Sequence, residues 1–231
     1  MLKKSLPSLK KKAKKNICKM LYEITKRIID VVGSIFCLIV FTPICVATAI
    51  AIEIESPGPV LADTPKRVGK NGKEFRLLKF RSMIPNAHNL LHTDPRFKKL
   101  LEEYKKSSYK LHDDPRVTKV GKFIRKHSID EVPQFLNVLK GDMSLVGPRA
   151  YYPFELAEQQ KKYLHTQKLV EEVLKVKPGV TGEWQVSGRS EINFDKRIEM
   201  DARYARKKSI FYDIIILAKT PGAMITGKGA V

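Results

Sequence analysis

Three observations predict an α+β fold, mostly helical, in which a Pro-broken re-entrant membrane helix and a short β-hairpin precede an α-rich cytoplasmic domain at the membrane surface. The positions from Val31 to Ile52 form a run of 22 residues without a charge. The pair Asn71-Gly72 is typical of a tight hairpin turn. From Asp94 onward, apolar residues recur mainly at helical spacing. A chain of 231 residues is long enough for one buried domain plus an appendage.

Charge and hydropathy divide the chain into a basic juxtamembrane tail (1–27), a membrane helix (28–55) and a domain (56–231). The formal net charge is +20, from 44 Lys and Arg against 24 Asp and Glu. The tail holds ten basic residues and one acid, so it carries +9 of that charge. Such a chain attracts polyanions, which leaves nucleic acid, acidic membrane and phosphorylated substrates as partners. A solvated tail is the plainer interpretation, but beside a membrane segment we expect it to bind acidic lipid.

The uncharged run is longer than the core helix of a small soluble domain usually is. A cleaved signal peptide is disfavoured, because the run begins about 30 residues from the start and lacks a cleavage pattern. Pro43, after Thr42, removes one helical hydrogen bond and predicts a kink. Either a bent spanning helix or a helix that returns to the same face satisfies this pattern. Basic residues on both sides of the run favour the second, with both flanks in the cytoplasm.

The remaining elements follow from turn signals and periodicity. We expect a strand over Val60–Ala62 and a returning strand over Phe75–Phe80, joined through the Asn-Gly turn. The cations of this hairpin fit either a solvated edge or a phosphate-binding wall. Helical segments are predicted from Asp94 and over 120–125, 129–139, 155–175 and 193–208, with a loop over 182–188 and a short apolar element over 210–217.

Cysteine and histidine spacings indicate no metal centre or disulfide framework. Cys37 and Cys45 lie inside the apolar run and Cys18 lies in the basic tail. His88 and His92 are four positions apart, but no third ligand accompanies them. The cysteines are therefore expected to be reduced and to fill apolar space.

The densest chemistry lies around Asp130 and Glu131, which are adjacent at the start of an apolar-faced helix. Acids in a first helical turn most often complement the helix dipole. Here four cations surround them in sequence: Arg125, Lys126, Lys140 and Arg149. Two carboxylates among cations also suit a divalent metal beside a phosphate, and a carboxylate can itself be a nucleophile. Both interpretations stay open on these residues alone.

Five motifs in one order make the sequence resemble a known family. They are SPGPV, RVGKNGKEF, KFRSM, DPRVTKVGKFIRKHSIDEVPQFLNVLKGDMSLVGPR and KPGVTGEWQVSGR, behind the Pro-broken apolar run. Together they resemble the bacterial sugar transferase family, the small monotopic phosphoglycosyl transferases that act as polyprenyl-phosphate sugar-1-phosphate transferases. The resemblance runs from about Lys26 to the end of the sequence and lacks the additional N-terminal spanning helices of longer members.

The resemblance implies an enzyme that transfers a sugar-1-phosphate from a UDP-sugar to polyprenyl (undecaprenyl) phosphate and releases UMP. Asp130 would attack the β-phosphate and form a covalent phosphosugar, with Glu131 as its partner and Mg²⁺ near both carboxylates. Such a step begins the assembly of exopolysaccharide, capsule, O-antigen or a glycoconjugate. The implied location is the bacterial inner membrane, in one leaflet, with the catalytic domain facing the cytoplasm.

The family's functional positions map onto named residues here. Thr42 and Pro43 fall on its helix break, which favours the re-entrant form, and Asp213 falls on a late acidic position. The implied phosphate-binding residues are Lys79, Arg81, Arg125 and Arg149. The implied nucleotide-binding residues are Pro178, Gly179, Thr181, Gly182, Gln185 and Arg189.

Two departures and several alternatives accompany this resemblance. Leu61–Pro65 replaces the family's usual strand sequence, and Ala150 stands where a proline is common. The ending and the segment over Tyr151–Gln167 favour a hexose, galactose or glucose, as the sugar. A nucleic-acid binder would need aromatic residues among its cations, so we expect no nucleic acid partner, and a membrane scaffold would leave Asp130 and Glu131 without a role. The sequence leaves a homodimer open.

Overall fold

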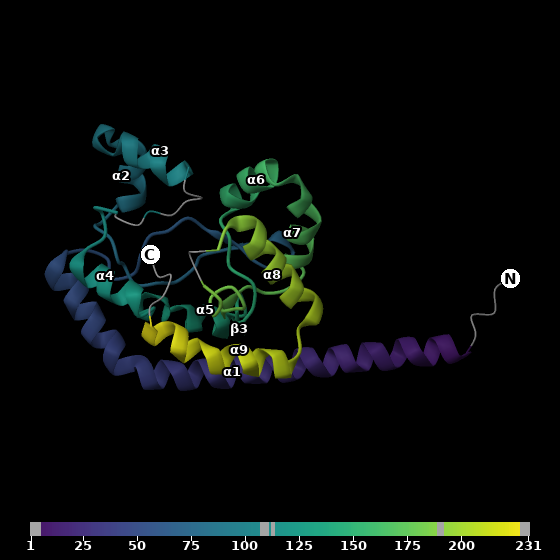
Figure 1. The fold of residues 1–231 in the computed structure, drawn as a ribbon. Coiled ribbons are helices and arrows are strands. Elements are labelled where there is room, and N and C mark those ends of the chain that lie inside the picture. The colour runs from purple at the N-terminus through teal and green to yellow at the C-terminus, as the bar shows by residue number, and fades with distance from the viewer. Residues whose placement is uncertain (1–5, 107–110, 112–113, 189–191, 227–231) are drawn as a thin grey trace.

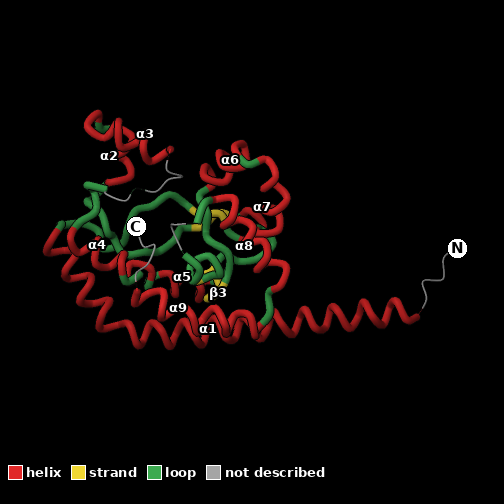
Figure 2. The backbone as a smooth tube through the Cα atoms, viewed as in Figure 1, coloured by secondary structure: helices red, strands yellow, loops and turns green. Residues whose placement is uncertain are grey.

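The computed structural model describes residues 6–106, 111, 114–188 and 192–226, with side chains from Asn16 on except at 105 and 106. The described part of the chain is mostly helical, as expected, and its strands form two small sheets. Figure 2 shows the short strands near the centre of the domain with helices around them. Arg189, a predicted nucleotide-binding residue, lies outside the described residues.

A single long helix, α1 (Leu6–Glu55), forms the base of the molecule. Pro43 lies inside it, and the Thr42 hydroxyl donates to the Leu38 carbonyl at 2.6 Å. Proline at this point leaves the carbonyl of Ile39 without its helical donor, and threonine back-bonding bends helices as well. Figure 1 shows α1 running straight along the base and then turning upward in its blue C-terminal part. Thr42 and Pro43 therefore explain the predicted kink, although the helix continues through it.

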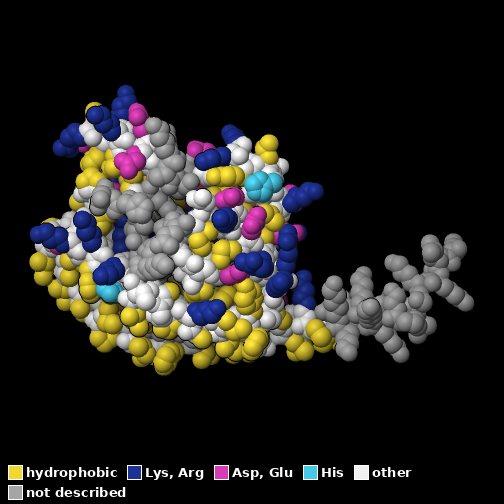
Figure 3. All heavy atoms as spheres, viewed as in Figure 1, with side chains coloured by type: hydrophobic (Ala, Val, Ile, Leu, Met, Phe, Trp, Pro, Cys, Tyr) yellow, Lys and Arg dark blue, Asp and Glu magenta, His cyan; other side chains and the backbone are white. Residues whose placement is uncertain are grey.

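The outer face of α1 is apolar and exposed. Within the described residues, the segment Asn16–Glu55 is the one helix long and apolar enough to cross a membrane, and only 11% of its most apolar window is buried. Phe36 and Ile39 are 65% and 68% exposed. Figure 3 shows hydrophobic side chains lining the lower edge of the molecule, along α1 and α9 (Ile210–Thr226). A face of this kind matches the expected contact with lipid, because water would disfavour so large an apolar surface.

The hairpin forms where the Asn-Gly pair predicted it. Strands β1 (Arg67–Val68) and β2 (Glu74–Phe75) pair antiparallel, and the turn η1 (Lys70–Gly72) joins them. Asn71 and Gly72 have φ of 57° and 78°, the left-handed conformation that such a turn requires. The flanking strands are shorter than predicted, since Leu61 contributes only an isolated bridge to Phe80.

A parallel pair of strands was not predicted. β3 (Ser144–Val146) pairs with β4 (Gly179–Thr181), and the chain crosses between them through α6 (Pro153–Lys162) and α7 (Gln167–Val173). The strands approach very closely beyond β3. A Cβ on Gly147 would lie 2.5 Å from the Lys177 carbonyl oxygen, and one on Gly179 would lie 2.1 Å from the Gly147 nitrogen. Glycine is therefore required at both positions for packing.

The other helices agree in kind with the expectation and differ in extent. The segment predicted over 155–175 is divided by the turn η4 (Leu164–Thr166), and α9 continues past Leu217 through Pro221. Gly141 ends α5 with φ of 89°, the usual left-handed cap. The further elements are α2 (Ala87–Thr93), η2 (Pro95–Phe97), α3 (Lys98–Lys106), α4 (Lys119–Lys126), η3 (Ile129–Glu131), α5 (Gln134–Lys140) and α8 (Phe194–Lys207).

Helix α1 packs on α4, α5, α9 and β3, so the base of the domain is built against this long apolar helix. In Figure 1, α9 lies along α1, while α2 and α3 stand apart from the rest at the upper left. Above the base, Phe75, Leu77, Val138, Met143 and Ala150 form one buried apolar cluster. This cluster joins β2 to α5 and β3, and it supports the floor of the site described next.

Candidate active site

Asp130 and Glu131 lie on the 3₁₀ turn η3, which precedes α5 and is separate from it. Ser128, the residue before this turn, has φ of 56°, a conformation that costs energy for any residue except glycine. The strained turn ends α4 sharply and redirects the chain. Asp130 is consequently buried, with 4% of its surface exposed, while Glu131 is half-buried.

The segment after the hairpin positions the Lys79 side chain beside Asp130. The Lys79 ammonium lies 2.9 Å from Asp130 Oδ2, and the Phe80 N–H donates to the Asp130 carbonyl at 2.9 Å. Asn137, on α5, fixes the same segment: its Oδ1 accepts from the Leu78 N–H at 2.9 Å and its Nδ2 donates to the Arg76 carbonyl at 2.8 Å. Lys79 is thus held beside the carboxylate by backbone contacts on both sides.

These residues border a cavity of about 340 Å³. Its walls hold Asp130 and Glu131 together with all four predicted phosphate-binding residues. Among the described residues the lining cations are Arg67, Lys79, Arg81, Arg116, Arg125 and Arg149. Cations outnumber the lining acids, which are Asp63, Asp114, Asp130 and Glu131. The cavity therefore favours a ligand with several negative charges.

The arginines of the cavity are held by neutral groups or by carboxylates. Arg125 donates from Nε to the Ser82 hydroxyl at 2.8 Å, and Arg81 donates to the Ser56 carbonyl and hydroxyl. Arg116 pairs with Asp114, with both side chains buried. Burial lowers the pKa of the Arg125 guanidinium below its usual value, so a bound anion would offset part of the cost of burying this charge.

Arg149 follows β3 and is positioned from two directions. Its backbone N–H donates to Asp201 Oδ2 at 3.1 Å, and its guanidinium lies 5.0 Å from the centre of the Trp184 ring. The Arg149 Nε is buried and has no hydrogen-bond partner within the described protein. Burial raises the pKa of the Asp201 carboxyl to about 7, although the Tyr151 hydroxyl also donates to it at 2.8 Å.

The predicted nucleotide-binding residues are only partly at the cavity. Gly179 and Gln185 line it, while Pro178, Thr181 and Gly182 do not. The last two serve the fold: a Cβ on Gly182 would lie 2.2 Å from the Gly147 carbonyl oxygen, and the Thr181 hydroxyl lies 2.9 Å from the Thr220 hydroxyl of α9. These residues hold β4 against the strand that leads to Arg149.

Asp213, Thr42 and Pro43 lie away from the cavity lining. Asp213 is buried near the start of α9, where its Oδ2 lies 2.8 Å from the Lys26 ammonium and its Oδ1 accepts from the Tyr204 hydroxyl at 2.7 Å. The structure therefore separates this acid from Asp130 and places it in a cluster with α1.

Sequence reasoning missed four cavity residues: Arg67, Arg116, Tyr152 and Trp184. The Arg67 guanidinium lies 3.3 Å from the centre of the Tyr152 ring, and its NH1 donates to the Ala150 carbonyl at 3.1 Å. Arg116 and Trp184 both stand inside quoted motifs, and Trp184 is the single tryptophan of the chain. These signals could have been followed. Arg67 also stands in a quoted motif, RVGKNGKEF, but only the folded hairpin brings it near Tyr152.

The side chains that line the cavity decide whether Mg²⁺ can bind there. No cluster of three or more His, Cys, Asp or Glu able to hold a metal occurs among the described residues. Mg²⁺, however, commonly takes one or two protein carboxylates and completes its shell with substrate phosphates and water. Asp130 and Glu131 supply two adjacent carboxylates on the cavity wall. The residues present fit Mg²⁺ in the company of a diphosphate.

A sequence model of the family described as Bacterial sugar transferase matches residues 21–227. The chain belongs to the bacterial sugar transferase family. This match includes α1 from residue 21 on, both sheets and every residue of the cavity wall. The carboxylates and cations of the cavity thus all lie inside the matched region.

Curated relatives are similar over nearly the whole chain. The chain is 43% identical over 212 residues to "Galactosyl transferase CpsE" of Streptococcus agalactiae, covering 90% of this chain and 43% of that protein. It is 41% identical over 219 residues to "Undecaprenyl-phosphate galactose phosphotransferase" of Salmonella typhimurium, covering 93% and 43%. A shorter relative, "Exopolysaccharide production protein ExoY" of Sinorhizobium fredii, is 35% identical over 207 residues, covering 90% and 88%. The chain therefore spans less than half the length of several relatives and most of the length of others.

Proposed function

We propose that this protein transfers a sugar-1-phosphate from a UDP-sugar to undecaprenyl phosphate and releases UMP. The observation that carries the proposal is the Lys79–Asp130 pair at 2.9 Å, set in a cavity with six lining cations among the described residues. The names of several relatives support the donor and acceptor classes. Two of these names specify galactose and one specifies glucose, so we propose a hexose as the sugar.

In the proposed first step, an Asp130 oxygen attacks the β-phosphorus of the UDP-sugar. A new oxygen–phosphorus bond forms, and the bond from the β-phosphorus to the bridging oxygen breaks. The bridging oxygen leaves with the electron pair as part of UMP. Lys79 directs the carboxylate, because its ammonium pairs with Oδ2.

In the second step, a phosphate oxygen of undecaprenyl phosphate attacks the same phosphorus. The Asp130–phosphorus bond breaks, the carboxylate is restored, and the product is an undecaprenyl-diphosphate sugar. Arg125 and Arg149 are positioned to stabilise the negative charge that gathers on the phosphoryl oxygens. Splitting the transfer in this way lets one site serve a soluble and a lipid-bound substrate in turn.

Mg²⁺ would be held by Glu131 and Asp130 together with diphosphate oxygens, where it would supply charge neutralisation for the departing phosphate. The protein's own part is to present the two carboxylates side by side on η3.

We propose that α1 enters one leaflet and returns at the bend near Thr42 and Pro43, with the domain on the cytoplasmic face. Three features support this topology: the exposed apolar face of α1, the bend, and the packing of α4, α5 and α9 on the same helix. A helix that returned to the surface would place the cavity where a lipid-bound phosphate can reach it. We also propose that two copies of this protein pair at the membrane. A measurement of the oligomeric state in detergent tests this.

The test is UMP release by the purified full chain in detergent, with Mg²⁺, undecaprenyl phosphate and a panel of UDP-sugars. Asp130→Asn should abolish release while the protein stays folded, since asparagine has nearly the same shape and no nucleophilic carboxylate. Glu199→Gln, an exposed acid-to-amide change on α8, is the matched control and should release UMP at the wild-type rate. Undiminished release by Asp130→Asn would overturn the assignment.

A further inference from the structure

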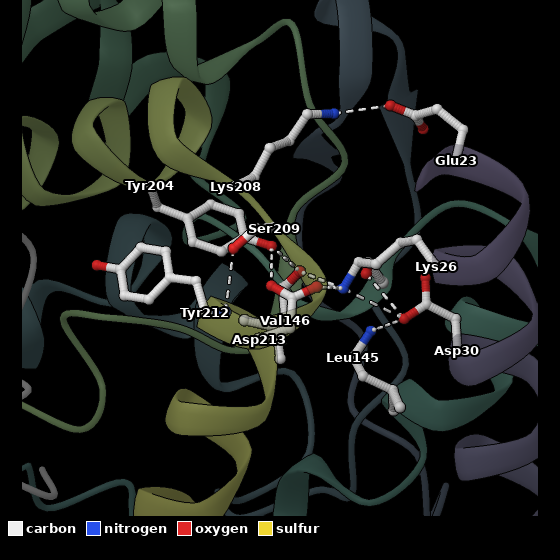
Figure 4. Close-up of polar contacts among 11 residues, drawn as sticks. Glu23, Lys26, Asp30, Leu145, Val146, Tyr204, Lys208, Ser209, Tyr212 and Asp213 are labelled. Atoms are coloured by element: carbon white, nitrogen blue, oxygen red, sulfur yellow. Dashed lines mark hydrogen bonds and ion pairs between the residues drawn. The ribbon is translucent and has the colours of Figure 1, made fainter. Parts of the chain in front are cut away.

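A buried ionic cluster joins the membrane helix to the strand behind the cavity (Figure 4). The Lys26 ammonium faces three acceptors: Asp213 Oδ2 at 2.8 Å, the Val146 carbonyl at 3.2 Å and Asp30 Oδ1 at 3.5 Å. Lys26, Asp30 and Asp213 are 9%, 3% and 3% exposed. The ammonium thus donates one hydrogen bond, to the Val146 carbonyl, and forms ion pairs with two buried carboxylates.

The cluster contacts every residue of β3. Asp30 Oδ1 accepts from the Ser144 hydroxyl at 2.9 Å and from the Leu145 N–H at 3.0 Å. Val146 is reached through its carbonyl oxygen, which accepts from Lys26 at 3.2 Å and lies 3.0 Å from the Tyr204 hydroxyl. Lys26 and Asp30, one helical turn apart on α1, thus fix the position and register of β3 relative to this helix.

From β3 the chain runs straight to the cavity. Gly147 donates from its N–H to the Thr181 carbonyl at 3.0 Å, and the Pro148 carbonyl accepts from the Gly179 N–H at 2.8 Å. Arg149, the next residue, lines the cavity. Gly147 lies so close to β4 that no side-chain atom separates the two backbones. The segment from β3 to Arg149 is therefore held tightly against β4. A shift of β3 on α1 must therefore move Arg149.

A buried ionic cluster is seldom the most stable choice. Apolar side chains of similar size often stabilise a fold as much or more, whereas removal of one charged partner is costly. The better-supported use of such a cluster is to specify one register among several. Here the contacts that carry this specificity all end on β3, three to five residues from Arg149.

We infer that Lys26, Asp30 and Asp213 are positioning residues for the transfer reaction: they set β3 on the membrane helix and thereby place Arg149 against the substrate phosphates. This inference rests on the proposed function, because it assigns the phosphates to Arg149. In this inference Asp213 acts through β3 and does not contact the substrate. The position of α1 against β3 thereby affects the geometry of the cavity. Tyr204 supports the arrangement through its hydrogen bond to Asp213 at 2.7 Å.

The test is a double-mutant cycle between Asp213→Asn and Arg149→Ala, with kcat/KM for the UDP-sugar as the readout. Asparagine keeps an acceptor for Tyr204 and loses the ion pair with Lys26. We expect kcat/KM to fall about tenfold in the wild-type background and less than about twofold in the Arg149→Ala background, because positioning acts through that side chain. A general loss of stability would lower activity by the same factor in both backgrounds.

Two further variants keep the result interpretable. Thr166→Ala removes a fully buried hydroxyl that donates to the Tyr163 carbonyl, far from β3 in the chain, and should lower the melting temperature without changing kcat/KM. If Asp213→Asn does not fold, Tyr204→Phe tests the same cluster through a smaller change and should show the same dependence on Arg149.

Equal factors in both backgrounds, or an unchanged kcat/KM in folded Asp213→Asn, would overturn the positioning role. Those results would leave UMP release by the wild-type protein intact. Failure of the wild-type protein to release UMP from any UDP-sugar would instead overturn the proposed function, so the two failures are distinguishable.

Discussion

The Lys79 ammonium lies 2.9 Å from Oδ2 of Asp130, and the two side chains are only 20% and 5% exposed. Burying a charged group costs free energy unless an opposite charge pairs with it. The Lys79 ammonium supplies that pairing and fixes the position of the Asp130 side chain at the cavity wall. This is the condition that a carboxylate nucleophile needs.

Lys79→Met should lower the rate of UMP release at least about a hundredfold, since the ammonium that pairs with Asp130 and directs its carboxylate is lost. Lys79→Arg should recover part of the activity because it restores the charge but not the geometry. Steady-state kinetics on both variants checks this. Equal activity of the methionine variant and the wild-type protein would contradict the pairing role.

Asp201 should make stability fall as pH rises between about 4 and 7. Burial raises its pKa from 3.8 to about 7. In that window the folded protein keeps a proton that the unfolded chain has released, so this group destabilises the fold by up to about 1.4 kcal/mol per pH unit as pH increases. Asp201→Asn should flatten this part of the dependence. Chemical unfolding of both proteins at several pH values measures it, and parallel curves would contradict the raised pKa.

Gly147→Ala should disrupt both folding and activity, because its Cβ would lie 2.5 Å from one backbone atom and 2.7 Å from another. Backbone cannot give way as a flexible side chain does. Gly222→Ala is the matched control: nothing lies within 4 Å of its Cβ, and it stands inside α9, where alanine is favoured by up to about 1 kcal/mol. Thermal unfolding should therefore move in opposite directions for the two variants.

Removal of Mg²⁺ with a chelator should stop UMP release, and added Mg²⁺ should restore it. Because Asp130 and Glu131 alone are too few ligands for tight binding, the metal should bind weakly without a diphosphate. Calorimetric titration of Mg²⁺ with and without UDP measures this difference. Tight binding to the protein alone would contradict a site completed by substrate.

The sequence predicted the local features well, because their causes are local. The Asn71-Gly72 turn follows from backbone preference, and the end of α5 follows from Gly141. The resemblance to the family implied that Lys79, Arg125 and Arg149 bind phosphate in the site of Asp130. The structure places all four residues on one cavity.

What the sequence could not supply depends on long-range packing. The pairing of β3 with β4 joins segments more than thirty residues apart in the chain, through strands too short to show an alternating pattern. Asp213 illustrates the same limit, since its partner Lys26 lies at the other end of the sequence. Only the fold distinguishes an acid beside the substrate from an acid that holds a strand.

The central claim is that Asp130 becomes covalently bound to a sugar phosphate. The most direct measurement is mass spectrometry of the full chain after rapid mixing with Mg²⁺ and an accepted UDP-sugar, without undecaprenyl phosphate. The account predicts UMP in solution and a sugar-phosphate adduct on the peptide that contains Asp130, absent from Asp130→Asn and discharged when undecaprenyl phosphate is added. Release of UMP only when both substrates are present, with no adduct at any time, would contradict it.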